Sequence, residues 1–526
     1  MKTSTLKSRT LLTIGGVFVI LALLNFVSVR LFGRVDMTRN DLFSLSDASK
    51  ELMGSLDDRI TVKAYFTEDL PAPYSNHRRT LLDQLNEFRA YSKGNFQFEF
   101  IDPTGEQGEQ DAQRQGIAQA QVQVVRDDKF EVKRAYMGMA FFYEDRKEVI
   151  PIIENIGSLE YDIASAVKKL TTRTRAKIGF LTGQGEPELT EFGTVQKELS
   201  RQYDVLPVDL SGSGGVPADL SALIIVAPKQ RFPEPVKYQV DQYIMRGGRV
   251  AFLLNKVDAD LQQRFGRPVD LGIEDLLEQY GVRLNADLIR DLQCANITIV
   301  QQQFGFSMQS QVPFPYLPLV SDFSKENMVV KDLKGVILFF ASSVDTTQLS
   351  GKGLRGEVLL RTSKQAGRQE QYFMLDPLQR FTQAEFALVG VPLGVTISGK
   401  FTSAYAGKPV PTDTAAAAPP AGPPIAESPD TRIVLIGDGD FARDSYLGNR
   451  DNLTLFANIV DYLVDNAGLI TIRSKDATLP PLEQVSDGTK KLLKYGNLVV
   501  PPALVLLVGL IRWRMRKARK KAMEIA

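Results

Sequence analysis

Residues 177–192 read KIGFLTGQGEPELTEF, an apolar run that ends in a glycine-rich turn and leads into a helix-like segment. Similar apolar runs return in ALIIVA (222–227), in VAFLL (250–254) and, after a long interval, in RIVLI (432–436). Runs without polar alternation are typical of parallel strands that helices cover on both faces. We therefore expect an α/β unit with a parallel sheet, in which the last strand and the helix near 453–463 return after a large insertion.

The preceding part of the chain has a different pattern. Residues 60–66 (ITVKAYF) and 96–101 alternate as half-buried strands, and residues 80–91 have the apolar spacing of a helix. Ser46 is expected to cap a short helix before them. The order strand, helix, strand, optional helix, two strands and helix is that of a thioredoxin-like layer. The C-x-x-C motif is missing, so this fold would carry no redox function.

The insertion contains one sequence that matches the spacing of a nucleotide-binding P-loop. Residues 394–401 read GVTISGKF, with Phe401 in place of the Ser or Thr that holds Mg²⁺. Its β-branched residues favour a strand, and no helix signal follows to cradle a phosphate. We therefore interpret this segment as a strand. Residues 406–430 are rich in proline and alanine and predict a linker.

Both ends of the chain carry apolar segments. The nineteen residues 11–29 contain no charge, which is close to the length that a membrane-spanning helix needs. A cleaved signal peptide would have a shorter apolar run and a cleavage site of small residues, and 30–34 read RLFGR instead. The second segment, 492–511, contains one lysine and precedes a basic tail. We expect two membrane-spanning helices.

The basic tail sets the expected orientation. The last fifteen residues carry seven cations against Glu524, or +6, so the rest of the chain sums to −5 within a net charge of +1. By the positive-inside rule the tail is cytoplasmic, and two crossings place the N-terminus there too. The main domain is then periplasmic or extracytoplasmic, on a two-pass protein of the inner (cytoplasmic) membrane. The remaining negative charge argues against a nucleic-acid surface.

The expected domains follow from these boundaries. Listed in chain order, they are a cytoplasmic N-terminus (1–10), a transmembrane helix (11–32), the thioredoxin-like domain (36–172), the first part of the α/β domain (176–257), its insertion (258–405), the linker (406–430), the second part of the α/β domain (431–470), a membrane-proximal segment (471–491), a second transmembrane helix (492–511) and the basic tail (512–526).

The residue inventory restricts catalysis. Cys294 and His77 are the single cysteine and the single histidine. A zinc site of the usual kind needs three or four such ligands, so no metal site is expected. A Ser-His-Asp or Cys-His device would depend on His77, which we interpret as a surface residue. We therefore expect no catalytic residue and no cofactor.

Candidate binding residues lie at the ends of the expected strands. Gly183, Gly185 and Glu186 form a strand-to-helix turn, the place where flavodoxin-like sheets bind ligands. Asp209, Asp438 and Asp440 follow other strands and would face the same crevice. The competing interpretation, which we favour, is that glycine and aspartate serve here as turn and capping residues.

The order of these features resembles the GldG-like, gliding-motility-type auxiliary component family of ABC transporters. The resemblance spans nearly the whole chain, and its most specific parts are RVDMTRNDLFSLSDASKELMGSLDDRITVKAYFTEDLP (34–71), FLTGQGEPE (180–188), VLIGDGDFARDSYLGNRDNLTLFANIVDYLVDN (434–466) and the final helix with RWRMRKARKK. It implies an outer sheet similar to class I glutamine amidotransferases. Their nucleophilic cysteine has no counterpart here, because Asn255 and Lys256 follow the strand 250–254.

The resemblance implies a non-catalytic accessory subunit that acts with a separate ATPase and a separate permease. Two alternatives remain open at this point. One is an extracytoplasmic protein that binds a small molecule or a glycan in the crevice near Gly185, Glu186 and Asp438, without an ABC partner. The other is a hydrolase that uses an Asp/Glu pair.

Overall fold

The computed structural model describes residues 44–473, except for 69, 71–73, 127–128, 154, 212–214, 304–305, 332, 412–422, 448 and 465–466, and ten positions between 494 and 515. The chain divides into two compact units, 1–477 and 478–526. The predicted span 11–32 lies outside the described residues, and six positions of 492–511 are described. Across the described residues, no helix has both the length and the apolar character to cross a bilayer.

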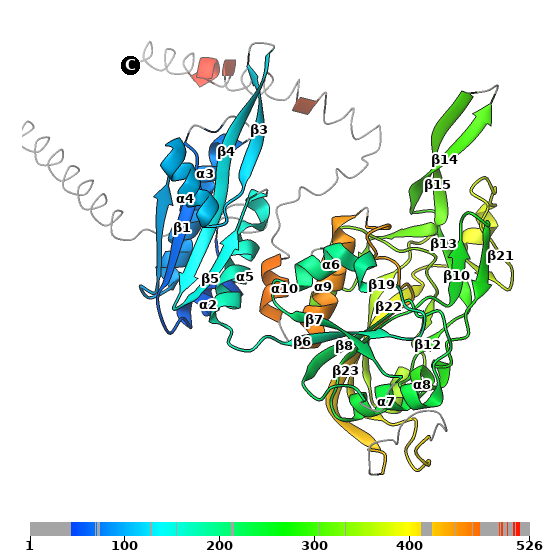
Figure 1. Cartoon of the computed structure of the whole chain (residues 1–526). Coiled ribbons are helices and arrows are strands. Elements are labelled where there is room, and N and C mark those ends of the chain that lie inside the picture. Colours follow the sequence, from blue (N-terminus) through cyan, green and yellow to red (C-terminus); the bar gives the residue numbers. More distant parts are fainter. Residues whose placement is uncertain are drawn as a thin grey trace, which may run out of the picture. The chain divides into compact units, whose positions relative to one another are not determined.

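The first unit is a mixed α/β structure whose largest element is an eight-stranded sheet (Figure 1). Its strands lie in the order β16-β19-β22-β23-β9-β8-β6-β7. Strands β6, β7, β8, β9 and β23 are mutually parallel, and β22, β19 and β16 continue the sheet in antiparallel pairing. Their bounds are β6 Lys177–Thr182, β7 Asp204–Asp209, β8 Leu220–Val226, β9 Val250–Leu253, β16 Asp322–Phe323, β19 Arg355–Arg361, β22 Pro392–Thr402 and β23 Glu427–Ile436.

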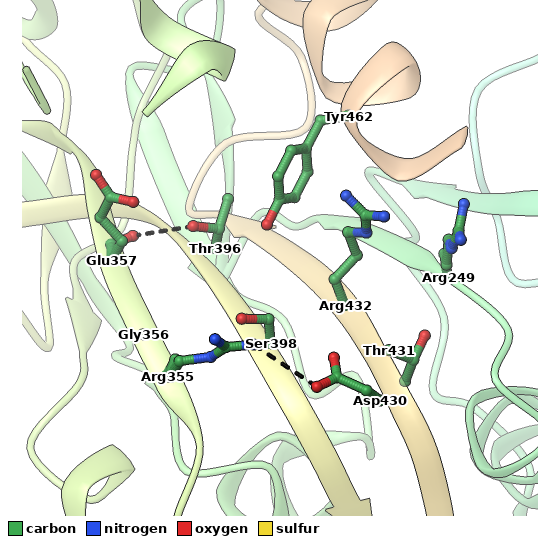
Figure 2. Close-up of a pocket in the computed structure, with 10 residues that line it drawn as sticks. All are labelled: Arg249, Arg355, Gly356, Glu357, Thr396, Ser398, Asp430, Thr431, Arg432 and Tyr462. Carbon is green, nitrogen blue, oxygen red and sulfur yellow. Dashed lines mark hydrogen bonds and ion pairs between the residues drawn. The ribbon is translucent and has the colours of Figure 1, made fainter. Parts of the chain in front are cut away.

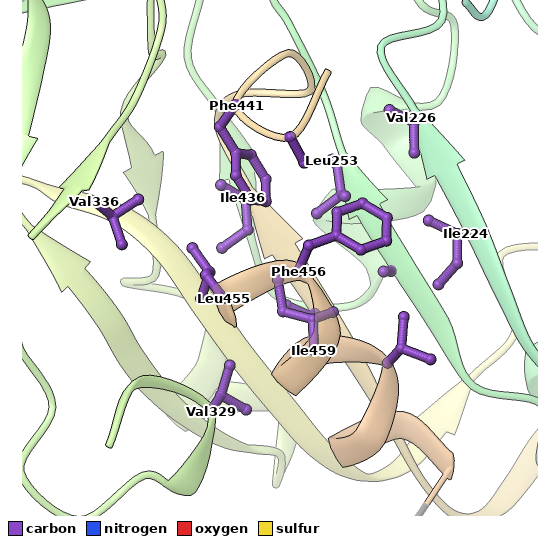
Figure 3. Packing of buried hydrophobic residues seen from close by; sticks show 14 of the residues in the cluster. Ile224, Val226, Leu253, Val329, Val336, Ile436, Phe441, Leu455, Phe456 and Ile459 are labelled. Atoms are coloured by element: carbon purple, nitrogen blue, oxygen red, sulfur yellow. The ribbon is translucent and has the colours of Figure 1, made fainter. Parts of the chain in front are cut away.

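Helices cover both faces of the parallel part of this sheet. Helix α9 (Arg450–Val464) turns Leu455, Phe456 and Ile459 toward Ile224 and Leu253 of the sheet (Figure 3). The spacing of these residues produces the apolar stripe of an amphipathic helix. Helix α7 (Glu234–Met245) packs on the opposite face, and α6 (Gly193–Leu199) lies on the α9 side. Strands β8 and β9 are buried on both faces, which explains their uninterrupted apolar sequences.

The predicted strands 177–181, 222–227, 250–254 and 432–436 are confirmed, and so is the return of the last one to the sheet. Two features were not anticipated. Strands β16, β19 and β22 come from residues 258–405 and yet extend the main sheet. Strand β23 begins at Glu427, within the predicted linker, because Glu427 to Arg432 pair with β22. The P-loop-like segment 394–401 lies in β22, which confirms its interpretation as a strand.

In its described residues, the rest of the insertion consists of antiparallel pairings, one α-helix, α8 (Glu274–Gln279), and three short 3-10 helices at Met328–Val330, Leu349–Lys352 and Gln383–Phe386. The pairs are β10 (Val257–Asp260), β11 (Phe265–Pro268) and β21 (Phe373–Met374); β12 (Arg283–Leu284) and β18 (Val344–Asp345); β13 (Asp287–Asp291) and β20 (Ala366–Glu370); and β14 (Cys294–Gln303), β15 (Phe306–Val320) and β17 (Val336–Ile337). Because Val329 and Val336 pack against α9, part of the insertion belongs to the core of the main sheet (Figure 3).

The N-terminal layer contains a five-stranded sheet of order β2-β1-β4-β3, with β5 also paired to β4. The chain order β1-α3-β2-α4-β3-β4-β5-α5 follows the predicted order, except that three strands rather than two lie between α4 and α5. Their bounds are α2 Asp47–Gly54, β1 Ile60–Phe66, α3 His77–Tyr91, β2 Phe96–Ile101, α4 Gly105–Arg114, β3 Gln119–Arg126, β4 Lys129–Tyr143, β5 Arg146–Ile150 and α5 Leu159–Thr171.

A buried carboxylate joins α2 and α5, the first and the last helix of this layer. Ser46 is the N-cap of α2, and its side chain accepts a hydrogen bond from the Ser49 amide, as predicted. Glu160 of α5 accepts hydrogen bonds from the Ser46 amide at 2.7 Å, from the Ser46 hydroxyl at 2.6 Å and from the Ser49 hydroxyl at 2.7 Å. The three donors satisfy a carboxylate oxygen whose burial without hydrogen bonds would be costly.

Helix α10 (Ala467–Arg473) lies between the N-terminal layer and the main sheet. Leu469 and Ile472 belong to the apolar core of the N-terminal layer. Arg473 donates hydrogen bonds to Asn458 at 2.6 Å and Asp461 at 2.8 Å on α9, and to the Tyr161 hydroxyl at 2.8 Å on α5. One short helix therefore contacts both parts of the unit: its apolar residues pack in the N-terminal layer, and Arg473 donates hydrogen bonds to both parts.

Candidate functional site

The turn after β6 has a conformation that glycine favours. Gly183 and Gly185 have φ angles of 105° and 78°, in the left-handed region. A Cβ atom on Gly183 would lie 3.3 Å from a carboxylate oxygen of Asp209, at the end of the neighbouring strand β7. The Gln184 carbonyl accepts hydrogen bonds from the amides of Lys229 and Gln230, which follow β8. The turn is thus hydrogen-bonded to the loop after β8 and lies close to Asp209 at the end of β7.

Glu186 is the one half-buried acid of this turn. Its Oε2 atom accepts a hydrogen bond of 2.7 Å from the Gln184 amide, and its Oε1 atom is buried without a hydrogen-bond partner. Burial raises the pKa of Glu186, and the nearby charge of Asp209 acts in the same direction. Asp209 itself is exposed, and hydrogen bonds from Ser211 lower its pKa. The structure therefore brings Gly183, Glu186 and Asp209 together at the ends of β6 and β7.

Asp438 lies at the end of β23 and is fully buried. Its carboxylate oxygens accept hydrogen bonds from the Phe339 amide at 2.6 Å and from the Asp440 amide at 2.7 Å. Burial, the largest effect, raises the pKa of Asp438 well above its ordinary value, although these amides favour the ionised form. Both oxygens are used within the fold, which agrees with the interpretation of Asp438 as a turn residue.

The segment around Phe339 and Ser342 covers the end of β23. The Ser342 amide donates to the Gly437 carbonyl at 2.7 Å. A Cβ atom on Gly437 would lie 2.0 Å from the Ser342 carbonyl oxygen, a separation that no side chain tolerates. The insertion therefore occupies part of the edge at which open α/β sheets bind their ligands.

Asp440 belongs to a separate set of contacts. It accepts hydrogen bonds from the Asn255 side chain at 2.6 Å and from Arg443 at 2.8 Å. Arg443 also forms an ion pair with Glu191, which follows the β6 turn. Asn255 lies two residues after β9, in the turn where the resemblance to amidotransferases would require a cysteine. It donates to Asp440 and accepts from the Gly439 amide at 2.7 Å, so it holds the β23 turn in place.

The described residues include no group of three or more His, Cys, Asp or Glu side chains arranged to hold a metal ion. Cys294 is half-buried at the start of β14, and burial raises the pKa of its thiol to about 11. A thiol with such a pKa stays protonated at neutral pH and is a poor nucleophile.

A pocket of about 590 Å³ lies elsewhere, beside the start of β23 and the end of α9 (Figure 2). Arg432 stacks over the ring of Tyr462 with 5.0 Å between the guanidinium carbon and the ring centre. Arg249 donates to the Leu463 carbonyl at 2.6 Å, and Arg355 pairs with Asp430 at 3.6 Å. The lining residues are Arg249, Arg355, Gly356, Glu357, Thr396, Ser398, Asp430, Thr431, Arg432 and Tyr462.

The sequence analysis did not find this pocket, because its residues come from five segments that lie far apart in the chain. One local signal was present. In residues 395–398 (VTIS) the polar and apolar side chains alternate, with Val395 and Ile397 in the core and Thr396 and Ser398 at the pocket. Such alternation indicates a strand with one polar face.

Comparisons with known proteins give one full-length relative. An uncharacterized protein of Borreliella burgdorferi is 23% identical over 507 residues, which span 94% of this chain and 95% of that protein. Among solved structures, the mmIFT52 N-terminal domain aligns with a TM-score of 0.34 and 14% identity, over 55% of this chain and 97% of that one. PurLQS from Thermotoga maritima aligns with a TM-score of 0.26 and 9% identity, over 55% of this chain and 100% of that one. Scores this low support no inference about the present chain.

Two family profiles match the chain. A domain of unknown function, DUF7088, matches residues 39–142. The family described as ABC-type uncharacterized transport system matches residues 175–466, which include all eight strands of the main sheet. Since this match spans more than half of the chain, the protein belongs to this family of auxiliary components of ABC-type transport systems.

Proposed function

We propose that the protein is a non-catalytic, membrane-anchored accessory subunit of an ABC-type transporter. In this proposal, which follows the GldG-like, gliding-motility-type resemblance, it acts outside the cytoplasmic membrane with separate ATPase and permease subunits. The family match over residues 175–466 carries the proposal. The apolar segments at 11–29 and 492–511 and the +6 tail support two membrane anchors with both termini in the cytoplasm.

The proposal also assigns a fold type to the N-terminal layer and to the main sheet. The order of elements in residues 36–172 supports a thioredoxin-like domain without a redox motif. The parallel run β7-β6-β8-β9-β23 supports a flavodoxin-like or amidotransferase-like sheet. The contacts of Asn255, which lies where that chemistry needs a cysteine, favour a structural use of this edge over catalysis.

Topology provides the first test. A reporter inserted at the exposed Ser350 should be active outside the cytoplasm, and one fused after Ala526 should be active inside, because cations are retained on the cytoplasmic side. Alkaline phosphatase and a green fluorescent protein report the two compartments. Replacing the seven cations of the tail with glutamine is the control, and it should weaken the orientation of the second anchor. A cytoplasmic signal at Ser350 would contradict the proposal.

The second test concerns the partners. Mild detergent extraction of the tagged full-length protein should retain a polytopic permease and its ATP-binding subunit, identified by mass spectrometry. In the matched control, unrelated apolar helices of equal length replace residues 11–29 and 492–511. We expect this variant to remain folded and to lose most of the permease, because Gly15, Gly16 and Gly509 allow close helix contact. Absence of both subunits from the wild-type complex argues against the proposed role, whereas full retention by the control moves the contact to the outer domain.

A further inference from the structure

Three arginines lie in one row across the main sheet. Strand pairing places Arg355 of β19 opposite Ser398 of β22, and Ser398 opposite Arg432 of β23. The side chains of Arg355, Ser398 and Arg432 therefore share one face of the sheet. Arg249 and Arg432 directly precede Val250 and Ile433, which are partners in the parallel strands β9 and β23. Figure 2 shows the side chains of Arg249 and Arg432 extending in the same direction. Like charges on neighbouring strands repel one another, and this row concentrates three positive charges at one place on the sheet.

The row marks the place where the helix cover of the sheet ends. Two positions further along, the same face carries Val434 and Ala251, which are buried in the core beneath α9. Tyr462 lies in the last turn of α9, and Arg432 stacks on its ring. Arg249 donates to the carbonyl of Leu463 in the same turn. These contacts fix the two guanidinium groups at the wall of the pocket, which lowers the entropy that binding a ligand would cost.

The charges that line the pocket leave an excess of one positive charge. The lining holds three arginines and the two carboxylates of Glu357 and Asp430. Glu357 also accepts a hydrogen bond of 2.8 Å from Asn327, and one from Ser324, in the neighbouring loop. Asp430 pairs with Arg355, and their side chains are 67% and 78% exposed. Because an exposed pair is weak, an anion of higher charge density can displace Asp430 from Arg355.

We propose that this pocket binds an organic phosphate, with the phosphate group held by Arg249 and Arg432 and the organic part lying over Ser398 toward Arg355. Guanidinium groups bind phosphate oxygens in pairs, and two adjacent ones supply several fixed donors. A volume of about 590 Å³ leaves room for more than an inorganic ion. The phosphate ester is either a soluble metabolite or a lipid headgroup, since both present anionic phosphate oxygens to a guanidinium group. This site goes beyond the accessory role proposed above and does not depend on it.

The test titrates the full-length protein in detergent, at constant ionic strength, and follows binding by calorimetry. The probes are glycerol 3-phosphate, dihexanoyl phosphatidylglycerol below its micellar concentration, and inorganic phosphate. We expect saturable binding of at least one ester, and weaker binding of inorganic phosphate. Preference for glycerol 3-phosphate assigns a soluble ligand, and preference for the short-chain lipid assigns a headgroup.

Four substitutions in the pocket should each change the affinity for the phosphate ester in a predicted direction. R249Q and R432Q should each weaken binding at least tenfold, and R355Q by several fold. D430N should strengthen binding several fold, because the amide no longer competes for Arg355. R264Q is the matched control, since Arg264 is 63% exposed and pairs with Asp376 at 3.5 Å, much as Arg355 pairs with Asp430. It should leave the affinity unchanged.

Three results would overturn the site: no saturable binding of either ester, equal weakening by R264Q, or weaker binding by D430N. If circular dichroism shows that R249Q or R432Q is misfolded, R355Q and D430N decide, because both residues are exposed. All titrations omit the permease and the ATPase. A negative result here is therefore separate from a failure to purify those subunits.

Discussion

Replacing Arg473 with methionine is expected to lower the free energy of unfolding by about 3–5 kcal/mol. The methionine keeps most of the volume of the side chain but removes its charge and its donors. Asp461, whose side chain is 1% exposed, and Tyr161 would then lose their shared partner. A buried ion that has lost its partner costs far more than the intact pair contributes. Urea titration of the full-length protein, followed by circular dichroism, measures the change.

The pH dependence of R473M separates lost charge from lost packing. Burial raises the pKa of Asp461, and the charge of Arg473 opposes that shift. An acid whose folded pKa is raised destabilises the fold as pH rises above its ordinary pKa. Without Arg473 this loss should be steeper, so R473M should be closer to the wild type at pH 5 than at pH 8. An effect of equal size at both pH values would contradict the role of the charge.

R201M is the matched control for R473M. Arg201 pairs with Glu198 at 3.4 Å and with Asp162 at 2.9 Å, and its side chain is 43% exposed. It belongs to the same junction between the N-terminal layer and the main sheet, but solvent screens it. Exposed pairs contribute about 0–1 kcal/mol, so R201M should change the stability by no more than that. A loss as large as that of R473M would indicate that methionine itself is poorly tolerated at the junction.

The second large effect is expected for Asp438→Asn, with a loss of about 2–4 kcal/mol at pH 7. The carboxylate accepts hydrogen bonds from the amides of Phe339 and Asp440 through different oxygens. An asparagine offers one acceptor, and its NH₂ group would face a backbone N–H without a partner. The Phe339 segment, which covers the end of β23, should then loosen. Hydrogen exchange of residues 336–343, measured by mass spectrometry, should detect the faster opening of this segment.

The raised pKa of Asp438 also predicts how the stability of the wild type changes with pH. The ionised form is disfavoured by burial, so wild-type stability should fall as pH rises from the ordinary aspartate pKa toward the raised value. Asp438→Asn should remove that part of the pH dependence. Asp209→Asn is the control, because Asp209 is exposed at the end of β7, and it should change the stability by less than about 0.5 kcal/mol. Equal losses in the two variants would contradict the structural role assigned to Asp438.

The parallel strands were predictable from the sequence because they are buried on both faces. Burial on both sides demands an unbroken apolar run, and KIGFL, ALIIVA and VAFLL satisfy that demand locally. The antiparallel extension was not predictable in the same way. Strands β19 and β22 have one polar face, and their partners lie far away in the chain. Nothing in a local pattern specifies which distant strand pairs with which.

The candidate binding residues show the same limit. Gly183 and Glu186 follow β6, and Asp209 ends β7. Because neighbouring parallel strands end at one edge of a sheet, these positions in the sequence already suggested that the three residues lie close together. Sequence reasoning could not tell that Asp438 is buried, because its cover comes from residues 339–342, nearly a hundred positions earlier. The arginine row depends on register between four strands, which is set only when the whole sheet has formed.

The pairing of β9 with β23 has a consequence for how the chain folds. Val250 has its partner in Ile433, so the strand at the middle of the sheet keeps one open edge until the ribosome has made nearly the entire domain. Pairings between such distant residues form slowly because a long loop must close first. During that interval β8 and β9 present apolar faces and an unpaired edge, the usual starting point for aggregation. Nascent chains that stop before residue 433 should therefore need a chaperone, and truncation there should yield insoluble protein.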